Sequence, residues 1–106
     1  HAGGQDQGIT PPEFLLASLG TCAGYYAVEY LKARSLPSEN VQVQVRAEKA
    51  LNPGRLAQFW IDVEVAGLAE DRHKEGVLRA VKRCLIHNTL LTAPAIEVKV
   101  QAPVTI

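Results

Sequence analysis

The chain contains two cysteines, Cys22 and Cys84, which are the side chains with the greatest capacity for chemistry. A thiolate acts as a nucleophile, a metal ligand or a redox group, whereas a buried thiol acts mainly as a small apolar side chain. Two cysteines are too few for the disulfide framework of a small secreted protein, but they suffice for one redox pair. Because a disulfide requires Cα atoms within about 7 Å, the spacing alone leaves their pairing open.

The segment around Cys22 is predicted to be a long helix. Thr10 can cap its N-terminus, Pro11 suits the first helical position, and Glu13 stands where a capping box places its carboxylate. The helix should continue to about Arg34, and its apolar residues cover nearly all of its faces. We therefore expect a central, buried helix.

Two glycines, Gly20 and Gly24, flank Cys22 within this helix. Each costs about 1 kcal/mol relative to alanine in a helix interior, so close packing should compensate for them. Small residues four positions apart form a smooth patch on which a second helix can approach. That second helix would come from this chain or from a partner subunit, and we expect a homodimer.

Two strands with alternating apolar residues follow the helix. The segments 41–50 and 57–67 each alternate with a period of two, and "LNPGR" between them has the composition of a hairpin turn. A second, amphipathic helix is predicted over 70–90, with an apolar face formed by Val77, Leu78, Val81, Cys84 and Leu85.

A last strand is predicted over residues 93–102, through Ile96, Val98 and Val100. The expected element order is thus α-β-β-α-β, an α+β fold in which both helices pack on an antiparallel sheet. We expect residues 1–106 to form a single domain, with residues 1–9 as a loop.

Composition excludes several classes of function. Eleven basic side chains balance eleven acidic ones, which argues against a nucleic-acid or anionic-membrane surface. The longest apolar run, residues 14–28, is too short to cross a bilayer comfortably. No signal peptide is recognised, and we expect a cytoplasmic protein.

Three blocks of the sequence together resemble the OsmC-like proteins, which include the organic hydroperoxide resistance enzymes. They are "GITPPEFLLASLGTCAGYYAVEYL", "RAEKALNPGRLAQFWIDVEVAGL" and "KRCLIHNTL". The resemblance covers the chain from Gly8 onward and implies an α+β, intertwined homodimer. It also implies that the N-terminal strands of the family are missing from this chain.

The chemistry implied by the resemblance is thiol-dependent reduction of peroxides. Cys22 would be the peroxidatic residue and would be oxidised to a sulfenic acid. Cys84 would resolve it to a disulfide, which an external dithiol, such as a lipoyl group, would reduce. No bound cofactor is implied, and Leu19 and Tyr26 would form apolar walls that favour organic hydroperoxides as substrates.

Glu13 matches the family glutamate that holds an arginine beside the reactive thiolate. The arginine belongs to the missing N-terminal strands. In a straight helix, Glu13 lies on the opposite side from Cys22 and about 13 Å away along the axis, so it cannot contact the thiol directly. A purely structural role as part of the capping box is a complete alternative.

Two other functions remain open from the sequence. The chain could be a catalytically inactive OsmC-like dimer that binds a hydrophobic small molecule at the subunit interface. It could also place Cys84, His87 and His73 together as metal ligands, although a zinc site would need further ligands. We expect no metal.

Overall fold

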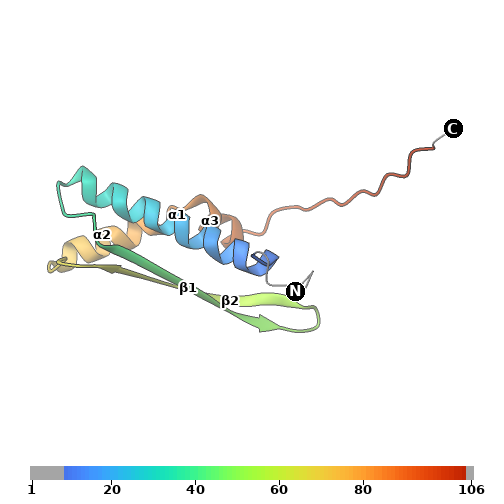
Figure 1. Cartoon of the computed structure of the whole chain (residues 1–106), viewed down its shortest axis with the longest axis horizontal. Coiled ribbons are helices and arrows are strands. Elements are labelled where there is room, and N and C mark those ends of the chain that lie inside the picture. Colours follow the sequence, from blue (N-terminus) through green and yellow to red (C-terminus); the bar gives the residue numbers. More distant parts are fainter. Residues whose placement is uncertain (1–8, 105–106) are drawn as a thin grey trace.

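The structure is a computed structural model that describes residues 9–104. Its elements are, in chain order, α1 (Pro11–Ala33), β1 (Val41–Ala50), β2 (Arg55–Val65), α2 (Asp71–Val81) and α3 (Leu85–Leu91). The helices cover a two-stranded antiparallel sheet, and the C-terminal segment extends away from them (Figure 1). The α+β class is confirmed, but the observed order is α-β-β-α-α. The predicted loop over residues 1–9 lies almost wholly outside the described residues.

Helix α1 begins as the sequence predicts. The backbone N–H of Thr10 donates to Glu13 Oε1 at 2.8 Å, and the backbone N–H of Glu13 donates to Thr10 Oγ1 at 3.4 Å. This reciprocal pair is a capping box. The helix is buried along one stripe only, rather than on nearly all faces, because no described element covers its outer side. The fully buried residues of this stripe are Leu19, Ala23, Ala27 and Leu31.

The glycines of α1 lie against a strand and not against a helix. A Cβ atom added to Gly20 would lie 3.3 Å from Val45 Cγ2, and one added to Gly24 would lie 3.6 Å from Val43 Cγ2. The predicted contact of these glycines with the second helix of this chain is therefore wrong, and their contact with a helix of a partner subunit stays a prediction. The smooth patch instead lets the apolar face of β1 approach the helix.

The two strands pair in the predicted antiparallel hairpin. Val41 pairs with Val65, and the register shifts between Glu48 and Lys49, near the turn. Alternating residues of both strands are partly buried, in agreement with the period-two pattern of the sequence. The valine face of the hairpin packs beside the core formed by α1 and α2.

The predicted helix over 70–90 is two helices. Helix α2 ends at Val81 and α3 begins at Leu85, with Cys84 between them in an extended conformation (φ −57°, ψ 131°). The Sγ atom of Cys84 accepts a hydrogen bond from the backbone N–H of His87 at 3.5 Å and so caps α3. The chain changes direction at Cys84, which is bonded to α1.

The predicted strand over 93–102 is not formed. Ile96, Val98 and Val100 are 79%, 83% and 91% exposed, and the segment has no regular secondary structure. Alternation favours an extended chain, but a strand also requires a hydrogen-bonded neighbour. No described strand lies beside this segment.

Candidate active site

A disulfide joins Cys22, in the middle of α1, to Cys84, between α2 and α3. The two Cα atoms are 5.8 Å apart although the residues are 62 positions apart in the sequence. This distance between the Cα atoms is typical of disulfides. The packing of α1 against α2, through the buried cluster of Ala23, Ala27, Leu31, Val77 and Val81, brings the two cysteines together.

The two cysteines differ in their exposure to solvent. Cys84 is 1% exposed, whereas Cys22 is only partly buried and lines a hollow on the outer side of α1. The other residues of this hollow are mostly apolar or aromatic: Phe14, Ala17, Ser18, Thr21, Tyr25, Tyr26 and Ile86. A small molecule can therefore approach Cys22 from solvent, while Cys84 is reached through Cys22.

Leu19 and Tyr26, the predicted apolar walls of one substrate site, line two different cavities. Tyr26 lines the Cys22 hollow, and its ring meets that of Tyr25 edge to face at 5.4 Å between centroids. Leu19 is 1% exposed and does not line this hollow, because it belongs to the buried stripe of α1. Leu19 contributes instead to a separate groove.

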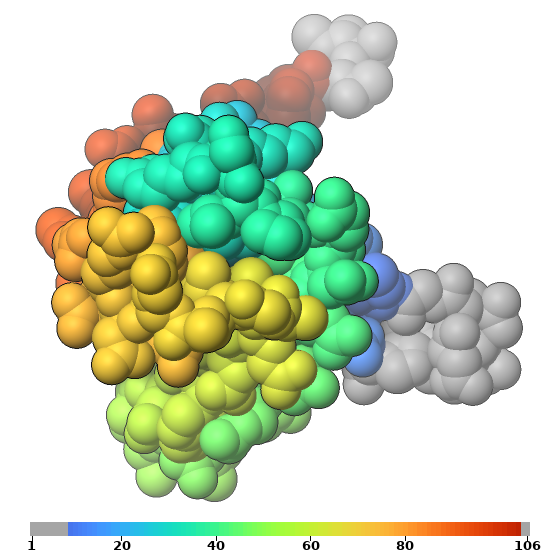
Figure 2. Space-filling view, turned by 90° about the vertical axis from the view of Figure 1, so that its left-hand side faces the viewer, coloured from blue at the N-terminus to red at the C-terminus, as the bar shows by residue number. Residues whose placement is uncertain are grey.

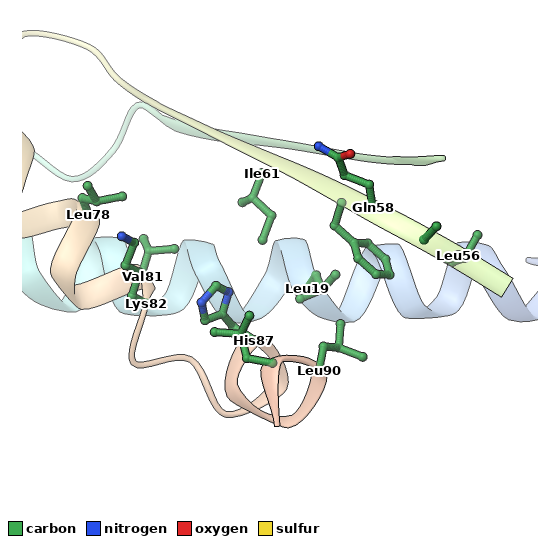
Figure 3. Close-up of a pocket in the computed structure, with 12 residues that line it drawn as sticks. Leu19, Leu56, Gln58, Ile61, Leu78, Val81, Lys82, His87 and Leu90 are labelled. Atoms are coloured by element: carbon green, nitrogen blue, oxygen red, sulfur yellow. The ribbon is translucent and has the colours of Figure 1, made fainter. Parts of the chain in front are cut away.

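That groove, here called the apolar groove, lies between α1, β2, α2 and α3 (Figure 3). Its volume is about 550 Å³, and most of its walls are apolar. The lining residues are Leu19, Leu56, Ala57, Gln58, Phe59, Ile61, Leu78, Val81, Lys82, His87, Leu90 and Leu91. The sequence did not indicate this groove, because it depends on the turn at Cys84, which places α3 against α1 and across the groove from β2.

Glu13 is exposed, and its carboxylate interacts with the N-cap of its own helix. Glu13 Oε1 accepts hydrogen bonds from the backbone N–H and the hydroxyl of Thr10, at 2.8 and 3.1 Å. These bonds, the backbone one above all, hold the pKa of Glu13 below its ordinary range. Glu13 is not among the residues that line the Cys22 hollow. Its contacts within residues 9–104 are those of the capping box.

The hollow around Cys22 has little charge. None of the described residues that line it is cationic. The hydroxyl of Tyr25, at its rim, donates to Glu29 Oε2 at 2.9 Å, and this carboxylate raises the pKa of Tyr25. The lining side chains thus offer apolar surface and hydroxyl groups, but no cation to pair with a thiolate.

His73 and His87 lie in different places. The hydroxyl of Tyr30 is 3.1 Å from Nδ1 of His73 in the first turn of α2, and Nε2 of His73 is 3.3 Å from Glu70 Oε1. His87 lines the apolar groove. Among residues 9–104, no three His, Cys, Asp or Glu side chains are grouped to hold a metal ion. The alternative of a site formed by Cys84, His87 and His73 is therefore not supported.

The length and apolar content of the described helices determine whether they could span a membrane. None of them is both long enough and apolar enough to cross a bilayer.

Comparison with known proteins agrees with this geometry. Residues 4–99 match the family model described as OsmC-like protein, and no curated protein matches the sequence. A crystal structure from Psychrobacter arcticus 273-4, of a protein named for osmotic stress induction and a detoxification response, superposes with a TM-score of 0.74 at 14% identity. The match covers 80% of this chain and 62% of that one, so the chain spans less than two thirds of the length of the solved protein. The chain belongs to the OsmC-like protein family.

Proposed function

We propose that the chain is a thiol-dependent peroxidase that reduces organic hydroperoxides and acts as a homodimer. The observation that carries the proposal is the Cys22–Cys84 disulfide, since a two-cysteine peroxidase passes through this oxidised state. The unequal burial of the two residues supports the assignment of roles, with the accessible Cys22 as peroxidatic residue and the buried Cys84 as resolving residue. Membership of the OsmC-like family is consistent with it.

The proposed cycle balances in three steps. The Cys22 thiolate attacks a peroxide oxygen, the O–O bond breaks, and the alkoxide leaves as an alcohol after taking a proton, so that Cys22 becomes a sulfenic acid. The Cys84 sulfur then attacks the Cys22 sulfur, the S–O bond breaks, and water leaves with the proton of Cys84. Finally, an external dithiol, such as a lipoyl group, reduces the disulfide by two exchange steps and becomes a disulfide itself.

The walls of the hollow favour an organic substrate. Phe14, Tyr25, Tyr26 and Ile86 present apolar surface beside Cys22, and an alkyl or aryl hydroperoxide would bury its organic group there. Hydrogen peroxide has no apolar group to bury and would gain nothing from these side chains. We therefore expect a higher kcat/KM for an aryl hydroperoxide than for hydrogen peroxide.

Intact mass spectrometry with a thiol count tests the proposal. Reduced protein is treated with one equivalent of cumene hydroperoxide and then alkylated. The wild type should lose both alkylatable thiols, Cys84→Ser should retain one added oxygen atom on Cys22, and Cys22→Ser should not react. Two free thiols after prolonged exposure would overturn the proposal, and a reactive Cys22→Ser variant would reverse the two roles.

A second candidate function is favoured by the apolar groove. A catalytically inactive dimer could bind a hydrophobic small molecule there, since about 550 Å³ lies within the volume range of small-molecule sites. Titration with an anilinonaphthalene sulfonate dye would test this function, with Leu90→Gln as the variant that changes the groove and Leu51→Gln, in the hairpin turn, as its control. Saturable binding that only Leu90→Gln weakens, together with unreactive thiols, would establish binding in place of catalysis.

A further inference from the structure

A third hollow, here called the basic hollow, lies between the side-by-side helices α1 and α2, and none of its residues lines the hollow of Cys22. Its volume is about 520 Å³. The lining residues are Glu29, Tyr30, Lys32, Ala33, Arg34, Gly76, Arg79 and Arg83. Figure 2 faces this end of the molecule, with the last turns of α1 in teal above the start of α2 in gold.

The charge of this hollow is strongly unbalanced. Four of its side chains are cationic and only one, Glu29, is acidic, which leaves a net charge of +3 in a chain whose overall formal charge is zero. Within residues 9–104, no carboxylate forms an ion pair with any of the four cations. Glu29 itself accepts a hydrogen bond from Tyr25, outside the hollow.

The sides of the basic hollow are formed by small residues and by the ring of Tyr30. Ala33 contributes little bulk at its edge, and Gly76 lets the ring of Tyr30 lie against the backbone of α2. Tyr30 closes one side: a Cβ atom added to Gly76 would overlap its ring. The guanidinium of Arg34 lies 3.8 Å from the centroid of the same ring, and its Nη1 donates to the Tyr30 carbonyl at 3.4 Å. Arg34 is thus oriented before any ligand arrives.

Helix dipoles account for only part of this arrangement. Lys32 and Arg79 each stand in the last turn of their helix, where basic residues are ordinary. However, α1 and α2 run in opposite directions, since Tyr30 meets Gly76 while Cys22 meets Cys84. The last turns of both helices nevertheless border the same hollow, and Arg34 and Arg83, which follow the last residues of α1 and α2, add two cations that the last-turn positions do not explain.

We infer that the basic hollow binds a phosphate-bearing small molecule. Arginine presents a planar fork that matches phosphate oxygens with two hydrogen bonds, and three arginines line this hollow. A net charge of +3 favours a multiply charged anion over a simple carboxylate. The volume lies within the range of small-molecule sites. This inference is independent of the proposed peroxidase function, since it uses neither cysteine.

Isothermal titration of the full chain with pyrophosphate, at an ionic strength held constant with sodium chloride, tests the inference. The wild type should bind one pyrophosphate per chain in a saturable manner. Arg79→Gln/Arg83→Gln should weaken binding by about 10-fold or more, because charge-assisted hydrogen bonds to two groups are lost. Lys32→Gln/Arg34→Gln provides the same test from α1 and should have a similar effect.

The matched control is Lys49→Gln/Lys99→Gln, which removes the same charge from a strand and from the C-terminal segment. It should bind pyrophosphate as the wild type does. Equal weakening in this control would show that only the overall charge matters and would overturn the inference. The absence of saturable binding to the folded wild type, as verified by circular dichroism, would also overturn it.

Discussion

Cys22 and Cys84 share a bond, but their surroundings differ. Cys22 borders a hollow of mostly apolar and aromatic side chains. Cys84 is 1% exposed, and its Sγ atom accepts a hydrogen bond from the backbone N–H of His87. In a two-cysteine peroxidase, the substrate has to reach the first sulfur, while the second only has to reach the first. The burial of each residue therefore agrees with the role that we propose for it.

The capping box predicts a pH effect at Glu13. Its pKa is lower in the folded state, so its contribution to stability is complete above the pKa of the unfolded chain. That contribution is lost as the pH falls through the folded-state pKa, below the ordinary glutamate range of about 4.3. Glu13→Gln should lower the urea midpoint at neutral pH and reduce the loss of stability in acid. Glu97→Gln, in the irregular C-terminal segment, should leave the profile unchanged.

Gly76 is the position where a single methyl group should matter most. Alanine favours a helix by about 1 kcal/mol over glycine, yet the added Cβ would overlap the ring of Tyr30. The ring would have to move and lose its contact with His73, so we expect a net destabilisation of about 1–3 kcal/mol. Urea unfolding measures this change. Gly54→Ala, where the added atom meets nothing within 4 Å, is the control; a neutral Gly76→Ala would contradict the tight packing.

At the scale of elements, the disulfide ties the segment before α3 to the middle of α1. Bridging residues 62 positions apart lowers the conformational entropy of the unfolded chain, which stabilises the folded state by about 4 kcal/mol in the loop-entropy model. We expect a reducing agent to lower the thermal midpoint of the wild type markedly. A Cys22→Ser/Cys84→Ser variant should be insensitive to the reductant, and a wild type that is equally insensitive would contradict the expectation.

Local signals predicted the first three elements well, since a capping box and period-two alternation depend on neighbouring residues. The split between α2 and α3 could not be predicted in this way, because no glycine or proline lies between Val81 and Leu85. It reflects the bond of Cys84 to a residue distant in sequence. For the same reason, the contact between Tyr30 and His73 left no local pattern, and the position of Leu19 followed from packing rather than from its spacing to Cys22.

At the scale of the whole molecule, much apolar surface remains uncovered. Phe14 is 60% exposed on α1, Leu85 is 69% exposed on α3, and the C-terminal segment carries exposed Ile96 and Val98. Large exposed apolar patches usually mark contacts with other molecules. We therefore expect a homodimer.

Sedimentation equilibrium tests this prediction by measuring the mass of the protein in solution. The wild type should sediment with twice the chain mass at micromolar concentration. Ile96→Lys/Val98→Lys places two charges on the exposed C-terminal segment and should weaken the association, whereas Glu97→Lys/Lys99→Glu, on intervening residues, should not. A wild type that is monomeric throughout this range would contradict the expectation.

The seven residues of α3 have a further consequence. None of them is buried, and the helix is anchored at its first turn by the bonded Cys84. The same helix supplies His87, Leu90 and Leu91 to the apolar groove. Cleavage of the disulfide should therefore let this wall detach, and the amide hydrogens of α3 should exchange faster in the reduced protein than in the oxidised one. The apolar groove would then be complete only in the oxidised protein. Ligand binding in the groove would therefore depend on the redox state of the two cysteines.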